Sequence, residues 1–188
     1  MSATPDNDDR FRLLYETHVD DLGAYCRRRL GADEAEDALA DVFAVAWRRV
    51  EDVPLGHEAR LWLYGVARNV VRNSERRARR RRRLNARLIG SSDPPESGPA
   101  ETLITMSEHE DVLEALVGLK PSDQELLRLR AWEELSRDDI ARVLGISVAA
   151  VDMRLHRAIA RMSRALKSDA VEISRDSTRR ADKRGGES

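Results

Sequence analysis

Apolar side chains recur every three or four positions along most of the chain, which is the period of an amphipathic α-helix. The first such stretch begins at Phe11 and ends near Leu30. Asp8 and Asp9 precede it as N-cap candidates, and Gly31 follows it as a C-terminal stop. The sequence shows no convincing alternation of the kind typical of β-strands. The pattern therefore predicts an all-α protein.

A second helical stripe runs from Leu39 to Val50. Asp33 and Glu36 have the spacing of a capping box, which predicts the start of this helix. Trp47 belongs to the apolar stripe, so we expect its side chain in the core.

A third stripe begins at Leu63, after a loop at residues 53–57, and continues into a basic end. Nine arginines face a single acid, Glu75, within residues 72–87. A helix cannot bury the run of five arginines at 79–83, so we expect this end to leave the core. The run alone fits a solvated tail or a nonspecific polyanion patch. With aromatic and amide side chains on the same helix, it favours a face that holds phosphates and exposed bases.

A change in composition divides the chain. Residues 90–99 contain three of the six prolines, and residues 88–119 contain seven acids but no Lys or Arg. We place an interdomain linker at residues 89–105. The prediction is two small helical domains, at residues 10–88 and 106–167, joined by this flexible linker. The flanking segments are a disordered N-terminus at residues 1–9 and a polar tail at residues 168–188.

The second domain begins with an apolar stripe at residues 112–119. Pro121 follows, and Ser122 with Glu125 predicts a capping box for the next helix.

The most specific motif follows at residues 135–151, where two short helices are joined by a glycine turn. Ser136 is placed to accept a hydrogen bond from the amide of Asp138 or Asp139, Gly145 permits a positive φ, and Ser147 caps the second helix. The layout is that of a helix-turn-helix, whose second helix lies in the DNA major groove. A purely structural helical hairpin is the alternative. The side chains predicted to pack inward are Val151, Leu155, Ala158, Ile159 and Met162.

Several classes of function are disfavoured. The single Cys26 has no disulfide or metal-spaced partner, and the four histidines lack ligand spacing. The sequence has neither a nucleophile elbow nor a Gly-rich phosphate loop, so we expect no catalysis, no metal and no cofactor. No apolar run approaches the roughly 20 residues that cross a bilayer, so we expect a cytoplasmic protein without membrane insertion.

Residues 33–47, 61–69 and 135–157 together resemble the sigma-70 superfamily of bacterial RNA polymerase initiation factors. The similarity is to its small two-domain extracytoplasmic-function (ECF) type, and it covers residues 11–166. It implies that core RNA polymerase and promoter DNA are partners, and that an anti-sigma factor is a possible third. The implied polymerase-docking residues are Asp37, Asp41, Phe43 and Trp47. The implied minus-10 residues are Trp62, Arg68, Asn69, Arg72, Asn73, Arg76 and Arg77. The implied minus-35 residues are Ser147, Ala149, Ala150, Asp152, Met153, Arg154, His156 and Arg157.

The resemblance also implies a mechanism. Asn69 would line a pocket for a base turned out of the nontemplate strand, with the loop at residues 53–58 as the other wall. Relatives often carry polar or basic residues where this chain has Asp152, Met153 and Ile159, so either the minus-35 preference is unusual or this domain binds weakly. Val53 stands where an aromatic wall is common.

The linker indicates why a polymerase is needed. As a coil, its roughly 17 residues would span on the order of 20 to 25 Å. Two promoter elements about two helical turns apart lie roughly 70 Å from one another. A scaffold must therefore hold both domains.

Two other functions stay open. A free-standing helix-turn-helix regulator would bind its operator tightly without polymerase. An enzyme acting on nucleic acid would need acids or histidines converging on a metal or nucleophile.

Overall fold

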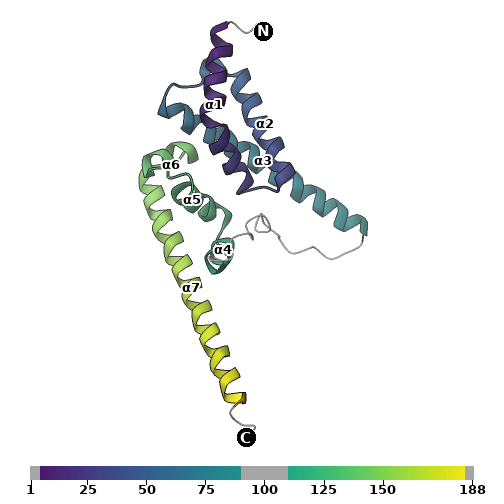
Figure 1. The fold of residues 1–188 in the computed structure, drawn as a ribbon, viewed down its shortest axis with the longest axis vertical. Coiled ribbons are helices and arrows are strands. Elements are labelled where there is room, and N and C mark those ends of the chain that lie inside the picture. Colours follow the sequence, from purple (N-terminus) through teal and green to yellow (C-terminus); the bar gives the residue numbers. More distant parts are fainter. Residues whose placement is uncertain (1–4, 90–109, 185–188) are drawn as a thin grey trace.

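The structure, a computed structural model, describes residues 5–89 and 110–184, and within these ranges it contains helices and no strand. Figure 1 shows two groups of helices lying against each other. The elements are α1 (Pro5–Arg27), α2 (Ala32–Arg48), a 3-10 turn η1 (Val50–Asp52), α3 (His57–Ile89), α4 (Glu110–Val117), α5 (Pro121–Ala131), α6 (Arg137–Leu144) and α7 (Val148–Arg184). The all-α prediction is confirmed.

The first group packs α1, α2 and α3 around a core of fully buried side chains that includes Leu22, Val42 and Leu63. The N-termini predicted for α1 and α2 are both wrong. Helix α1 begins at Pro5 rather than at Asp8 or Asp9, so residues 5–9 are helical and not disordered. Proline suits the first helical position because its missing N–H has no intrahelical acceptor there.

Contacts to η1 and to the residue that follows it hold the first turns of α1 in place. Asn7 donates to Glu51 Oε1 at 3.0 Å, and the guanidinium of Arg10 donates to the carbonyl of Val53. The predicted disorder was wrong because these partners lie more than 40 residues away in sequence.

The boundary between α1 and α2 also differs from the prediction. Helix α1 ends at Arg27, and Gly31 is the N-cap of α2 in an extended conformation without a side-chain cap. Since α2 begins at Ala32, Asp33 lies inside its first turn and forms no capping box with Glu36. Asp33 and Glu34 instead stabilise the helix through its dipole.

Helix α3 has 33 residues and is therefore about 50 Å long. Most of α3 packs in the bundle, and Arg81 still pairs with Glu34 of α2 at 3.5 Å, whereas the C-terminal end of the helix projects away from the other helices (Figure 1). Arg79, Arg80 and Arg81 are exposed, as predicted for the arginine run.

The second group packs α4, α5 and α6 against the first half of α7. The capping box predicted for α5 is absent because the helix begins two residues earlier than predicted, with Lys120 instead of Ser122 as N-cap and Pro121 at its first position. Ser122 is therefore inside the helix. Glu125 does not cap the helix. Its carboxylate instead accepts hydrogen bonds from Tyr25 and Arg29 of the first group.

The helix-turn-helix caps are as predicted. The Ser136 hydroxyl accepts a hydrogen bond from the amide of Asp139. The Asp139 carboxylate in turn accepts one from the Ser136 amide, which completes a capping box. Gly145 has φ 66° and ψ 40°, the left-handed conformation expected at this turn. The amide of Ala150 donates to Ser147 Oγ at 3.2 Å.

Helix α7 continues beyond the predicted domain end at residue 167, through the polar tail to Arg184. Residues 168–184 contain no Gly or Pro, so nothing in the sequence stops the helix. The predicted linker at 89–105 lies, apart from Ile89, outside the described residues.

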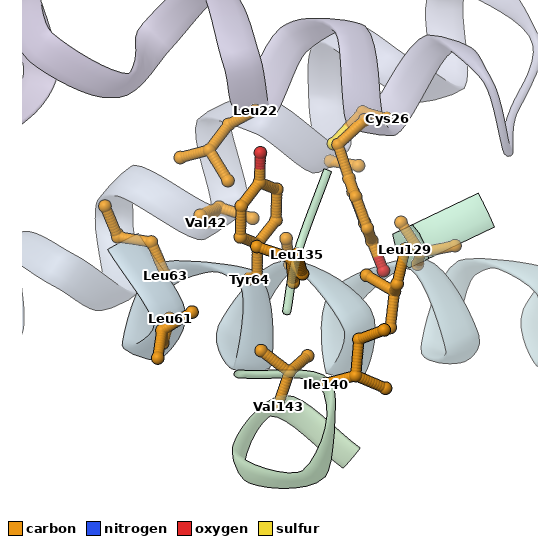
Figure 2. Close-up of a cluster of buried hydrophobic side chains, with 14 of the residues drawn as sticks. Leu22, Cys26, Val42, Leu61, Leu63, Tyr64, Leu129, Leu135, Ile140 and Val143 are labelled. Carbon is orange, nitrogen blue, oxygen red and sulfur yellow. The ribbon is translucent and has the colours of Figure 1, made fainter. Parts of the chain in front are cut away.

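The two groups share one core. The buried apolar cluster that begins in α1–α3 continues through Leu129 and Leu135 to Ile140 and Val143. Figure 2 shows Leu61, Leu63 and Tyr64 of α3 beside these residues of the second group. The domains predicted as separate units are therefore docked onto each other in this structure.

Candidate polymerase and nucleic-acid interfaces

The predicted docking residues lie along α2 and fall into an acidic pair and an aromatic pair. Asp37 and Asp41 are exposed one turn apart on the same face of the helix. Neither has an ion-pair partner among the residues that the structure describes. This face is thus an acidic surface that is open to a basic partner.

Phe43 and Trp47 form an aromatic cluster with α1. Phe43 is buried, with its ring centroid 4.7 Å from that of Tyr15 and 6.2 Å from that of Phe11. Trp47 is 40% exposed and packs edge-on against Phe11 at 5.0 Å. The expectation that Trp47 is core was wrong, because its side chain contacts Phe11 of α1 but stays exposed to solvent. Phe43 shapes the surface from inside, whereas Trp47 is part of it.

The predicted minus-10 residues lie on the exposed side of α3. Trp62, Asn69, Asn73 and Arg76 follow one another at helical spacings of seven, four and three, which places them on one stripe. Asn69, Asn73 and Arg76 are exposed, whereas Trp62 is half-buried with the Arg49 guanidinium 5.6 Å from its ring centre.

Three arginines flank this stripe. Arg72 and Arg77 are exposed, and Arg68 is half-buried with an Nε that has no hydrogen-bond partner. Residues 62 to 77 span about 22 Å of helix. Along that length the surface combines amide side chains, an aromatic ring and arginines that have no ion-pair partner among the described residues.

The predicted minus-35 residues surround the first turns of α7. Of this set, Ser147, Ala149, Met153, Arg154, His156 and Arg157 are exposed, and Ala150 and Asp152 are half-buried. Ala149, Ala150 and Met153 present small or apolar side chains, so the surface is less polar than its two arginines would indicate.

Two details of this surface were not predicted. Asp152 accepts a hydrogen bond from Arg137 of α6 at 3.0 Å, which compensates the charge of this acid on the first turns of α7. Ile159 was expected to pack inward but is 54% exposed. It lies seven residues after Asp152 and therefore on the same face, whereas Val151, Leu155 and Ala158 are buried as predicted.

A buried charged cluster, which was not predicted, lies where the end of α1 meets α5 and the loop after it. Arg29, only 1% exposed, donates through Nε to Glu125 and through Nη1 to Glu133, each at 2.8 Å. Tyr25 donates its hydroxyl to Glu125 at 2.8 Å, and the Arg29 guanidinium stacks 3.6 Å from the Tyr25 ring centre. We call Tyr25, Arg29, Glu125 and Glu133 the interdomain cluster.

The electrostatics of this cluster follow from burial and pairing. Burial, together with the Glu125 carboxylate, raises the pKa of the Tyr25 phenol well above its usual value. Burial alone would lower the pKa of Arg29, but Glu125, Tyr25 and Glu133 raise it, so Arg29 stays charged. Cys26 beside them is buried, which raises the pKa of its thiol to about 11. Cys26 is therefore an inert core thiol, in agreement with the sequence.

Further contacts join α6 to the start of α3. His57 lies 2.9 Å from Asp139, and Arg142 pairs with Glu58. Burial would raise the pKa of Asp139, but hydrogen bonds from His57 and Ser136 lower it. His57 and Glu58 were expected in the loop that forms one wall of the base pocket, but they begin α3 and contact the helix-turn-helix from there.

Chemistry of other kinds finds little support. No described helix is long and apolar enough to cross a membrane. Within residues 5–89 and 110–184, no three His, Cys, Asp or Glu side chains gather as metal ligands would.

Comparison with known proteins identifies the family of this chain. The family model for sigma-70 region 2 matches residues 14–82, and the model for sigma-70 region 4 matches residues 109–162. The RNA polymerase sigma factor CnrH of Cupriavidus metallidurans is 30% identical over 177 residues, which is 89% of this chain and 92% of CnrH. The ECF sigma factor BldN of Streptomyces coelicolor is 29% identical over 86% of this chain, and the chain spans 62% of the length of BldN.

Two solved structures have a related fold. CnrH in complex with the cytosolic domain of CnrY matches with a TM-score of 0.55 and 26% identity, over 85% of this chain and 88% of CnrH. The sigma factor RpoE of Bartonella quintana, solved with the anti-sigma factor NepR, matches in fold with a TM-score of 0.60 and 23% identity, over 85% of this chain and 98% of RpoE. Because both sigma-70 regions match in order and a 30% identical relative is covered over nearly its whole length, the chain belongs to the sigma-70 family, as an ECF-type RNA polymerase sigma factor that directs promoter-specific transcription.

Proposed function

We propose that three surfaces divide promoter recognition in this chain. The acidic face of α2 docks on core RNA polymerase, the stripe on α3 captures minus-10 bases, and the first turns of α7 read the minus-35 element. The exposed row of amide and arginine side chains on α3 is the observation that carries the proposal. The chain contributes binding rather than chemistry and acts in the cytoplasm with the polymerase.

The stripe on α3 suits a melted strand. Extracting one base from a duplex costs a few kcal/mol, which stacking and edge hydrogen bonds recover. Asn69 and Asn73 supply donors and acceptors for base edges, while Arg72, Arg76 and Arg77 hold flanking phosphates. Opening of the duplex then becomes selective for the sequence that these amides accept.

The first turns of α7 suit a major groove that carries methyl groups. Met153 and Ile159 offer apolar contacts to thymine C5-methyl groups, and Asp152 can accept from cytosine N4. The Arg137 guanidinium beside Asp152 reduces the repulsion between its carboxylate and nearby phosphates. We therefore propose a minus-35 element in which thymine contacts matter more than guanine contacts.

The proposal for α2 rests on charge and exposure. Asp37 and Asp41 point away from the bundle without internal partners among the described residues, so a basic helix can pair with both. Trp47 lies less than two turns away and adds apolar area. An anti-sigma factor is a further proposed partner, since the CnrH and RpoE structures each contain a protein bound to the sigma factor.

Run-off transcription with purified core polymerase tests the proposal. On a cognate promoter, Asn69→Ala reduces transcript yield about tenfold or more, because a base-edge contact is worth roughly 1–3 kcal/mol. Asn85→Ala is the matched control, since Asn85 is exposed on the same helix beyond the proposed DNA surface. Equal yields from the two variants would contradict the role of the stripe.

A mobility-shift experiment separates the rival function. The sigma-factor proposal predicts a promoter complex only when core polymerase is present. Tight, salt-sensitive binding of the free chain would favour a free-standing regulator.

A further inference from the structure

We propose that Arg49, the residue after the last turn of α2, is a further DNA contact of the minus-10 surface. Its guanidinium lies over the ring of Trp62, and there it binds a phosphate of the melted nontemplate strand. The contact extends the stripe on α3, so it rests on the function proposed for that stripe.

The backbone on both sides of Arg49 is fixed by hydrogen bonds. As the C-cap of α2, Arg49 donates its amide to the carbonyls of Val45 at 3.1 Å and Ala46 at 3.3 Å. Its own carbonyl accepts a hydrogen bond from the amide of Asp52 at 2.9 Å, which closes the turn η1. The side chain therefore leaves the corner between α2 and η1 from a defined position.

The side chain of Arg49 extends from this corner to α3. Its guanidinium carbon lies 5.6 Å from the centre of the Trp62 ring, which is within the range of a cation–π contact. Trp62 is half-buried and packs against the core, so its ring is a rigid support. Because the guanidinium lies over this ring, Trp62 positions Arg49 rather than stacking a base on the same face. The cation is thereby held at the N-terminal end of the stripe.

Most of the Arg49 guanidinium is available to a ligand. Its Nε donates to Asp52 Oδ2 at 3.1 Å, and its terminal nitrogens have no hydrogen-bond or ion-pair partner among the residues that the structure describes. The side chain is 56% exposed. A guanidinium presents its N–H groups as a planar fork, which matches the oxygens of a phosphate. Arg49 can therefore pair with Asp52 and with a phosphate at the same time.

The N-terminal end of the stripe is otherwise short of exposed cations. Residues 50–58 contain three acids and no Lys or Arg. The exposed arginines proposed to hold phosphates all follow Asn69 in the sequence, whereas Arg60 and Arg68, which are nearer to Trp62, are half-buried. A phosphate beside Trp62 would therefore meet acidic side chains without compensation if Arg49 were absent. With Arg49, a strand that lies along the stripe is held at both ends.

The salt dependence of DNA binding tests the contact. The holoenzyme is titrated, at a series of salt concentrations, with a single-stranded oligonucleotide that carries the nontemplate minus-10 sequence of a cognate promoter. Each phosphate contact to a single strand contributes about 0.7 to the slope of log K against log salt, so Arg49→Gln should lower the slope by about that amount. This corresponds to about fivefold weaker binding at roughly 0.1 M salt when the affinities converge near about 1 M. Arg49→Lys keeps the charge and should restore most of the slope.

Arg48→Gln is the matched control. Arg48 is exposed and adjacent, so this substitution removes the same charge but leaves the cation that lies over Trp62. Its salt slope should equal that of the unmodified chain. An equal decrease in Arg48→Gln and Arg49→Gln would overturn the inference, because it would reflect the net charge of this end of α2 rather than a contact of Arg49.

A double-mutant cycle tests the role of Trp62. Trp62→Leu removes the aromatic support, so Arg49→Gln should change the salt slope less in that background than in the unmodified chain. The same change in both backgrounds would overturn positioning by Trp62. The comparison of Arg49→Gln with Arg49→Lys needs no substitution at Trp62, so the phosphate contact stays falsifiable if Trp62→Leu does not fold.

Affinity for core polymerase separates this inference from the proposed function. Arg49→Gln should bind core polymerase as tightly as the unmodified chain, because the acidic face of α2 is unchanged. Weaker binding would assign Arg49 to the polymerase surface and overturn the DNA contact. An unchanged salt slope in Arg49→Gln, with Asn69→Ala still defective, would refute the contact alone. Failure of the unmodified holoenzyme to bind the strand would instead refute the function proposed for the stripe.

Discussion

Replacing Gly145 tests whether the helix-turn-helix depends on the backbone conformation of its turn. The residue has φ 66° and ψ 40°, and a Cβ built there meets no atom within 4 Å. The cost of Gly145→Ala is therefore conformational rather than steric. An L-residue in this region is destabilised by about 1–2 kcal/mol. Asn tolerates the conformation better, so Gly145→Asn should recover part of the loss.

Gly65 is the matched comparison within the same chain. It lies inside α3, and a Cβ there also meets no atom within 4 Å. Since no positive φ is required, Gly65→Ala should stabilise the protein by about 0.5–1 kcal/mol through helix propensity. The two substitutions add the same methyl group and are expected to have opposite signs.

Urea denaturation followed by far-UV circular dichroism measures both effects. Ranked from the highest to the lowest free energy of unfolding, the order should be Gly65→Ala, the unmodified chain, Gly145→Asn and Gly145→Ala. A Gly145→Ala variant as stable as the unmodified chain would refute the reasoning, because it would mean that the turn does not need the left-handed conformation. Loss of stability in Gly65→Ala would show that its surroundings are less open than the structure indicates.

Three further substitutions test other features. Glu134 has φ 54°, so Glu134→Gly should stabilise the chain by about 1 kcal/mol in the same urea assay, and an unchanged midpoint would contradict strain at this residue. Burial raises the pKa of the Cys26 thiol from 9.0 to about 11, so the stability that the neutral thiol contributes is fully present below pH 9.0 and is lost as the pH rises through about 11. The stability of Cys26→Ala should therefore fall less than that of the unmodified chain between pH 9.0 and about 11, and parallel curves would argue against a buried thiol. Arg137→Gln leaves the Asp152 carboxylate uncompensated beside the DNA phosphates, so the affinity of the polymerase complex for minus-35 DNA should drop, and an unchanged affinity in a binding titration would contradict this role of Arg137.

Most of the local structure could be predicted because it depends on neighbours in sequence. The helical periods identified every described helix, and the caps at Ser136, Gly145 and Ser147 form as expected. The exposed arginine end of α3 follows from the cost of burying charge. The caps predicted at Asp33 and Ser122 failed because each helix begins two residues earlier than predicted, which places those side chains inside its first turn.

The candidate surfaces were predicted in part. The residues on α3 lie on one helix, so their spacing alone placed them together. The exposure of Trp47 and Ile159 could not be read from the apolar pattern, because it depends on which neighbour covers each face. The Asp152 to Arg137 pair joins two helices whose angle the turn at Gly145 determines.

Helix type, the order of the elements and the recognition motif are thus encoded locally, in hydrophobic period, capping residues and charge runs. Docking of the two halves is not encoded in this way. Arg29 and Glu133 are separated by 104 positions, and each looks like an ordinary surface charge in its own helix or loop. Their burial follows only when two apolar faces meet, since the removal of water from those faces brings the charges together and requires that they pair.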